Sequence, residues 1–200
     1  MDESTKNLAR RRVMRIATGA LGIVGGLFAT VPFIRSMGPS ARARARGSPV
    51  SIDIGRLGAR QQLSTLWRGQ PVWVLHRDDD MLKELDNADL GARLDDPDSL
   101  TESQQPEYAR NPYRSIRPEY FVAVGLCTHL KCVPSFRPDI GSEGEAWLGG
   151  YFCPCHGSKF DLAGRVYRNV PAPTNLVIPP HRYLTDDVIQ IGVDAKTTSA

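Results

Sequence analysis

The sequence Cys127-Thr-His-Leu-Lys-Cys132, here called the first box, has a counterpart in Cys153-Pro-Cys-His-Gly-Ser158, the second box. Twenty residues separate the boxes, which together hold all four cysteines and two of the four histidines. Thiolate and imidazole groups bind zinc and iron, so the boxes supply six candidate metal ligands. Each box offers one Cys–His pair and one further cysteine.

Strand-like sequences flank both boxes. Tyr120–Leu126 is an apolar run that leads into the first box, and Trp147–Phe152 leads into the second. Lys159–Tyr167 continues as a hairpin with its turn at Asp161–Gly164. We therefore expect the boxes in two loops that lie side by side among antiparallel strands.

Further strands are expected on either side of this region. Val50–Ile54 alternates apolar and polar residues, as a strand with one buried face should. Leu63–Trp67 and Pro71–Leu75 indicate an antiparallel pair joined by a Gly-Gln turn, and Val188–Val193 closes the chain. The head, residues 50–200, is thus predicted to be mainly β.

One helix and one long polar segment interrupt the strands. Asp78–Leu85 is expected to form a capped helix with acidic residues at the positive end of its dipole. Residues 86–118 are polar and contain several prolines, which predicts a surface excursion. His76 and His181 have no cysteine near them in the sequence, so we expect surface or hydrogen-bonded structural roles.

Residues 1–36 are predicted to be an export signal and membrane anchor. The uncharged run Ile16–Ile34 has 19 residues, close to the roughly 20 that a helix needs to cross a bilayer. Basic residues precede it, which by the positive-inside rule keeps the N-terminus in the cytoplasm and places the rest of the chain outside. Arg10-Arg-Arg-Val-Met14 resembles a twin-arginine signal, which exports folded proteins.

Residues 37–49 are small and basic and have no apolar face, so they are expected to form a flexible tether about which the head moves. Ala41-Arg-Ala43 resembles a cleavage site, but the apolar run is longer than that of a removable signal, which favours a retained anchor.

Positive charge is concentrated in the N-terminal part. Residues 1–46 hold nine of the 25 Lys and Arg but only two of the 22 Asp and Glu, so the remainder is net acidic. A nucleic-acid-binding head would concentrate positive charge on itself. We therefore expect no nucleic-acid partner.

Three arrangements of the six box side chains are open. Two irons bridged by sulfides need four terminal ligands, zinc takes four tetrahedral ligands, and four cysteines could form two disulfides beside incidental histidines. The Pro and Gly-Ser context of the second box, the spare pair of cysteines and the predicted export favour iron.

Together the boxes resemble the Rieske [2Fe-2S] family. With the anchor, the tether and Val170-Pro-Ala-Pro173, the resemblance extends to the Rieske subunits of proteobacterial ubiquinol-cytochrome c reductases. The family implies an antiparallel β-sandwich head with an inserted cluster-binding subdomain, at about residues 120–175, preceded by one transmembrane helix. It also implies a quinol-cytochrome c oxidoreductase whose partners are cytochrome b and a membrane-anchored c-type cytochrome, in a dimeric complex.

The resemblance assigns roles to the box residues. Cys127 and Cys153 would bind one iron, and His129 and His156 the other. Cys132 and Cys155 would form the disulfide of the family, which suits an oxidising compartment. His156 would accept hydrogen from ubiquinol held by cytochrome b, with His129 also facing solvent. Imidazole ligands leave the cluster less negative than thiolates do, which raises its potential, and reduction raises the affinity of the histidines for protons.

Other residues would surround the cluster. Ser158 resembles the serine that donates a hydrogen bond to a bridging sulfide, following Gly157, and Leu130 and Val170–Pro173, here called the proline loop, would shield the irons from water. The residues that this resemblance places around the cluster are Ser158, Leu130, Phe160, Gly157, Pro171 and Pro173.

Two positions depart from the family. Phe160 stands where many members have a tyrosine, and Lys131 stands where many have a glycine. A missing hydroxyl donor should lower the cluster potential. A second function class is an exported Rieske subunit of an oxidoreductase such as arsenite oxidase, in which the partner is a molybdenum subunit and no quinol is handled.

Overall fold

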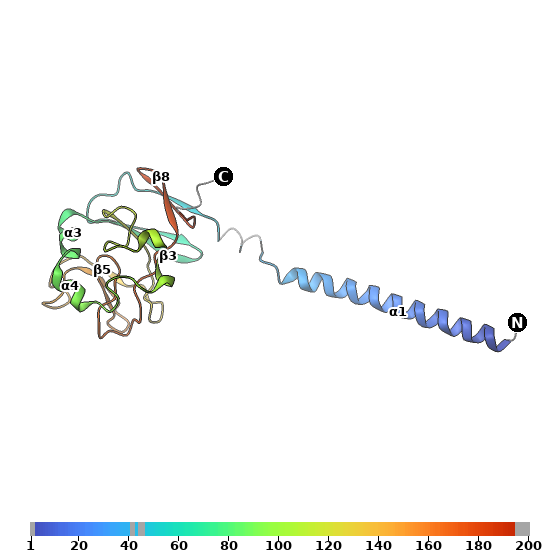
Figure 1. Cartoon of the computed structure of the whole chain (residues 1–200). Coiled ribbons are helices and arrows are strands. Elements are labelled where there is room, and N and C mark those ends of the chain that lie inside the picture. Colours follow the sequence, from blue (N-terminus) through green and yellow to red (C-terminus); the bar gives the residue numbers. More distant parts are fainter. Residues whose placement is uncertain (1–2, 41–42, 44–46, 195–200) are drawn as a thin grey trace. The chain divides into compact units, whose positions relative to one another are not determined.

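The structure is a computed structural model that describes residues 3–40, 43 and 47–194. The chain forms two compact units, Met1–Ala45 and Arg46–Ala200 (Figure 1). The predicted tether, residues 37–49, and the cleavage-like Ala41–Ala43 lie partly outside the described residues, so the predicted domain bounds stay a prediction.

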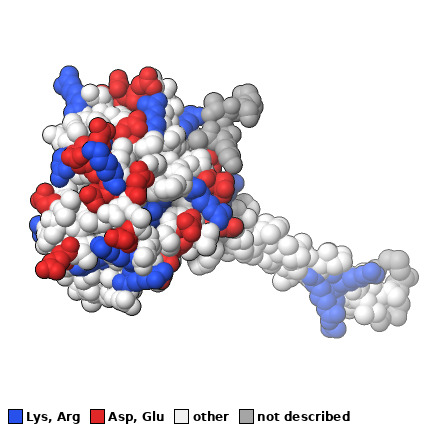
Figure 2. All heavy atoms as spheres, turned by 60° about the vertical axis from the view of Figure 1, so that its left-hand side comes forward, with Lys and Arg blue, Asp and Glu red and all other residues white. Residues whose placement is uncertain are grey.

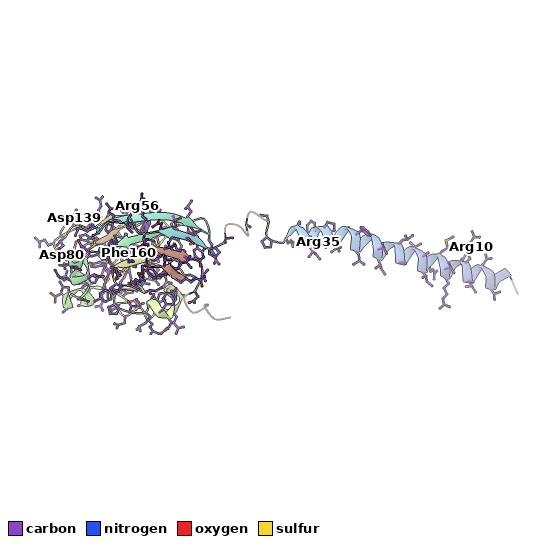
Figure 3. The ribbon with its side chains drawn as sticks, turned by 90° about the horizontal axis from the view of Figure 1, so that it is seen from above. Arg10, Arg35, Arg56, Asp80, Asp139 and Phe160 are labelled. Atoms are coloured by element: carbon purple, nitrogen blue, oxygen red, sulfur yellow. A yellow bond between two sulfur atoms is a disulfide. The ribbon has the colours of Figure 1, made fainter. Side chains whose placement is uncertain are left out.

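The first unit contains helix α1, Glu3–Ser36. Its segment Asn7–Ser36 has a mean hydropathy of 1.7 and is long and apolar enough to cross a membrane. The hydroxyls of Thr18 and Thr30 donate to helix carbonyls four residues earlier, so the helix satisfies its own polar side chains. Arg10 and Arg35 lie near opposite ends of it (Figure 3).

The head is built from antiparallel strands, as predicted. The described residues form three three-stranded sheets, with orders β1-β9-β8, β2-β3-β4 and β5-β6-β7. The strands are β1 Val50–Asp53, β2 Gln62–Trp67, β3 Gln70–His76, β4 Tyr120–Val124, β5 Ser135–Arg137, β6 Gly150–Phe152, β7 Lys159–Phe160, β8 His181–Thr185 and β9 Val188–Ile191.

Two apolar clusters hold the sheets together. One packs β1 and β9 against β2, β3 and β4, around Val74, Val122 and Ile189. The other lies on the opposite face of β3 and β4, where Trp73 stacks on Tyr151 of β6 with ring centroids 4.9 Å apart. The second cluster supports the subdomain that carries both boxes.

Three predicted features differ in detail. The turn between β2 and β3 consists of Arg68 and Gly69 and not of the predicted Gly-Gln pair. Both turn residues have positive φ. A two-residue turn of this kind matches the right-handed twist of the two strands. The strand before the second box begins only at Gly150, since Gly149 and Gly150 have positive φ. Strands β5 and β8 were not predicted from the sequence.

The polar region after β3 holds the helices of the head. Helix α3, Asp79–Leu85, is capped by the Asp78 carboxylate, which accepts from the Met81 N–H at 2.8 Å, and the predicted capped helix is confirmed. Helix α4, Ala88–Arg93, follows, and two 3-10 turns span Glu102–Gln104 and Glu107–Ala109.

The expectation of a surface excursion at residues 86–118 is wrong in part. Leu90, Leu94, Ala109 and Arg114 in this segment are buried. The segment has few apolar residues, and the polar side chains that it buries are anchored by hydrogen bonds, which no apolar period announces.

Charges of both signs are interspersed over the visible face of the head, while basic side chains gather toward one end of α1 (Figure 2). This distribution agrees with the charge pattern of the sequence.

Candidate metal centre

Both boxes fold into the same turn. In the first, the Cys127 N–H donates to the Cys132 carbonyl at 2.8 Å, and the Lys131 N–H donates to the Cys127 carbonyl at 2.9 Å. In the second, Cys153 donates to Ser158 at 2.8 Å, and Gly157 donates to Cys153 at 2.9 Å. Two loops with the same backbone hydrogen bonds thus each present one Cys–His pair, with the histidine two residues after Cys127 in the first and three residues after Cys153 in the second.

Close packing fixes where each loop begins. Gly125 precedes the first box, and a Cβ there would collide with the indole of Trp73. Gly150 starts β6, and a Cβ there would collide with the carbonyl of Phe160. These two glycines let the main chain of each loop approach the shared core.

The four proposed ligands lie together as two like pairs. Cys127 and Cys153 are free thiols, both buried, and the neighbouring Cys127 thiol adds to the effect of burial in raising the pKa of Cys153. The rings of His129 and His156 meet edge to face, with centroids 4.8 Å apart. His156 is exposed and His129 half-buried, so the thiols are on the protein side and the imidazoles on the solvent side.

A disulfide joins Cys132 to Cys155 and ties the two boxes together. Because Cys127 and Cys153 remain free, the arrangement with two disulfides is wrong. The donors that remain are two thiols and two imidazoles, which is the number of terminal ligands that two sulfide-bridged irons require. Burial raises the pKa of the Cys153 thiol, so binding a metal there displaces a proton.

The surroundings also fit a cluster. Ser158 is buried, and its Oγ accepts a hydrogen bond from the Ala172 N–H at 3.1 Å. This leaves the Ser158 hydroxyl hydrogen available for another acceptor, such as a sulfide. Leu130 is 63% exposed at the tip of the first box. In the proline loop, Pro171 and Pro173 are exposed on either side of Ala172.

Sequence reasoning missed two residues that hold this site. The Thr128 hydroxyl donates to the Thr174 carbonyl at 2.7 Å, which connects the first box to the end of the proline loop. Asn175 is buried and accepts from the Val166 N–H at 2.8 Å. Thr128 could have been noticed because it stands inside the box, whereas Asn175 had no signal.

The histidines outside the boxes are structural, as expected. His76 Nδ1 lies 2.7 Å from the Leu57 carbonyl oxygen, and His181 Nδ1 lies 2.9 Å from that of Pro179.

Comparison with known proteins agrees with this geometry. Residues 101–181 match the Rieske [2Fe-2S] domain, and residues 1–40 match the family described as the ubiquitinol-cytochrome C reductase Fe-S subunit TAT signal. The head is therefore a Rieske iron–sulfur domain that carries one [2Fe-2S] cluster, and the zinc alternative is wrong.

Relatives that match nearly the whole chain define the family more closely. The ubiquinol-cytochrome c reductase iron-sulfur subunit of Allochromatium vinosum is 56% identical over 94% of this chain and 90% of its own. That of Bradyrhizobium diazoefficiens is 38% identical over 94% and 97%. A chain of a hyperthermophilic respiratory Complex III aligns over 87% of this chain and 97% of its own, with 27% identity and a TM-score of 0.48. The chain belongs to the family of ubiquinol-cytochrome c reductase iron-sulfur subunits.

Proposed function

We propose that this chain oxidises ubiquinol at a site in cytochrome b, with release of protons, and passes the electron to a membrane-anchored c-type cytochrome. The relatives are named as subunits of a ubiquinol-cytochrome c reductase, which supports this reaction. Among the described residues of the head, 50–194, no feature favours an arsenite-oxidase partner over this one.

We assign the ligands by the two like pairs. Cys127 and Cys153 would hold the buried iron, and His129 and His156 the iron nearer solvent. The support is that both free thiols are buried and that the imidazole rings meet edge to face with centroids 4.8 Å apart. When bound, the cluster supplies one-electron redox chemistry at a potential of roughly −150 to +300 mV.

The exposure of His156 is the observation that carries the proposed function. Its imidazole is exposed, whereas the thiols that would hold the other iron are buried. The ring nitrogen of His156 that does not bind iron would accept the hydrogen bond and then the proton of a quinol hydroxyl, and His129 beside it would remain in contact with water. Leu130 and the proline loop would exclude water from the quinol side.

The chain would consist of a membrane anchor and a periplasmic head, joined by a tether. Residues 1–36 would span a bacterial inner membrane with a cytoplasmic N-terminus, residues 37–49 would be the tether, and residues 50–200 the periplasmic head, in a dimeric complex. The apolar segment Asn7–Ser36 and the match of residues 1–40 to an export-signal family support the anchor.

Electron paramagnetic resonance of membranes that contain the reduced protein tests the proposal. We expect the low average g value of a Rieske cluster, and a shift of the spectrum when an inhibitor occupies the quinol site. Turnover from ubiquinol to cytochrome c should depend on the same inhibitor. A cluster spectrum that no quinol-site inhibitor alters would contradict the assigned reaction.

We also propose that the head moves about the tether during turnover. Stiffening the tether tests this movement. Prolines at residues 41–46 should slow ubiquinol oxidation while the cluster spectrum stays unchanged. Glycines at the same positions are the matched control and should leave turnover intact. Full turnover in the proline variant would contradict a moving head.

A further inference from the structure

Residues 95–118, here called the brace, are hydrogen-bonded to the hairpin turn after the second box and to the residues that follow the proline loop. No role for this segment follows from its residues alone, yet it buries polar side chains. The buried polar residues of the brace are Ser99, Gln105, Arg114 and Ser115.

Arg114 is the centre of these contacts. Its side chain is fully buried, and the four hydrogens of its two terminal nitrogens contact five neutral oxygens, so one hydrogen is shared, while its Nε has no hydrogen-bond partner. Burial lowers the pKa of Arg114 to about 10, so the guanidinium stays charged at neutral pH. The acceptors are the carbonyls of Ala163 and Gly164 at 3.2 Å, of Leu176 at 2.9 Å and of Gln104 at 3.4 Å, and Oε1 of Gln105 at 2.9 Å.

These acceptors come from three separate segments. Ala163 and Gly164 form the hairpin turn after the second box, Leu176 follows the proline loop, and the two glutamines belong to the brace. The planar guanidinium spreads its terminal donors in a fixed fork and reaches all three segments at once, whereas a lysine ammonium offers only three donors at a single point.

The residues that follow the proline loop form hydrogen bonds both to the brace and to the hairpin. The Asn175 side-chain amide donates to the Asp96 carbonyl at 3.0 Å, while its oxygen accepts from Val166 of the hairpin. The Ile178 N–H donates to the Gln104 carbonyl at 2.7 Å. Residues 175–178 therefore lie fixed between the brace and the hairpin.

The proline loop is in turn fixed to both boxes. Ala172 donates to Ser158 of the second box, and the Thr174 carbonyl accepts from Thr128 of the first. A series of hydrogen bonds thus links Arg114 to the two boxes by way of the main chain of residues 172–176.

We propose that Arg114 is a positioning residue that holds the proline loop against the cluster and so limits the access of water to the irons. The inference rests on the proposed placement of the cluster between the boxes, and it gives the brace a task. Arg114 touches neither quinol nor the irons in this arrangement, and it acts through Leu176 and the proline loop.

Hydrogen exchange of the purified complex tests the proposal. The variants are Arg114→Met, which removes all five bonds, and Arg114→Lys, which keeps the charge. The control is Arg117→Met, in the same segment, because Arg117 pairs at the surface with Asp186 at 2.7 Å. Exchange is read in peptides covering residues 170–178, with strand β4 as the internal reference, and cluster loss to an iron chelator is followed in parallel.

Arg114→Met should raise exchange in residues 170–178 by roughly tenfold or more relative to β4, with Arg114→Lys in between. The cluster should be lost to the chelator faster in the same order, and Arg117→Met should match the parent in both. A uniform rise across the head, or unchanged exchange in the loop, would overturn the proposal and leave Arg114 a residue of general stability.

A second variant covers the case in which Arg114→Met does not fold. Thr128→Val removes only the bond from the first box to Thr174, and it should raise exchange at residues 172–176 relative to strand β4. Unchanged exchange there would count against the series of hydrogen bonds. Failure of the quinol-site inhibitor to alter the parent spectrum would reject the proposed function, whereas these exchange results judge Arg114 alone.

Discussion

Lys131 and Gly157 occupy equivalent positions in the two boxes. Each donates its N–H to the carbonyl of the first cysteine of its box, and each has a positive φ, 64° for Lys131 and 78° for Gly157. Glycine adopts this conformation freely, whereas a lysine is strained there. Lys131 therefore adds backbone strain to the first box, whereas Gly157 adds none to the second.

Replacing Lys131 with glycine should stabilise the head. We expect Lys131→Gly to raise the free energy of unfolding by about 1 kcal/mol, because it removes left-handed strain from a non-glycine residue. Lys131→Gln is the control, since it keeps the strain and removes the charge. Denaturant unfolding of the two variants compares them, and equal stabilities would show that the strain is negligible.

The hydroxyl of Ser158 should affect both stability and potential. Ser158→Ala removes the acceptor of the buried Ala172 N–H, which should cost about 1–3 kcal/mol. It also removes the donor proposed for a bridging sulfide, so the midpoint potential should fall. Redox titration and denaturant unfolding measure the two effects, with Ser135→Ala as a control outside the boxes. A potential equal to that of the parent would reject the proposed sulfide bond.

Phe160 is the position where a hydroxyl can be added. The side chain is fully buried within the head, where Figure 3 labels it. Phe160→Tyr should raise the midpoint potential, because many family members have a tyrosine there whose hydroxyl bonds a ligand sulfur. Phe136→Tyr, on strand β5 of the same sheet, should leave the potential unchanged. An unchanged or lower midpoint in Phe160→Tyr would refute this expectation.

Local patterns explain how much of the head was predictable. The boxes, the β2–β3 pair and the helix capped by Asp78 each follow from residues adjacent in sequence, so the sequence alone indicated them. Arg77 and Arg114 bury their guanidiniums against carbonyls far away in sequence, such as Leu162 and Leu176. Every residue type has a main-chain carbonyl, so the sequence does not indicate which carbonyls a buried arginine will bind. For this reason the role of residues 86–118 was missed.

The buried His181 should make stability depend on pH. Burial lowers the pKa of His181 below 6.5, so the folded head favours the neutral ring. This contribution is fully present above the unfolded pKa of about 6.5 and is lost as the pH falls through and below that value. The free energy of unfolding should therefore decline between pH 7 and pH 5, and His181→Gln should make that decline shallower. An identical pH dependence in the variant would contradict the assignment.

The acceptors of Arg114 are mostly peptide carbonyls, and this has a consequence for sequence change. Substitutions at residues 163, 164 and 176 that keep the local backbone would preserve every acceptor, whereas inserting or deleting one residue in the hairpin turn would displace two of them together. Divergent homologues should thus tolerate exchanges of side chains in these segments far more readily than changes in their length.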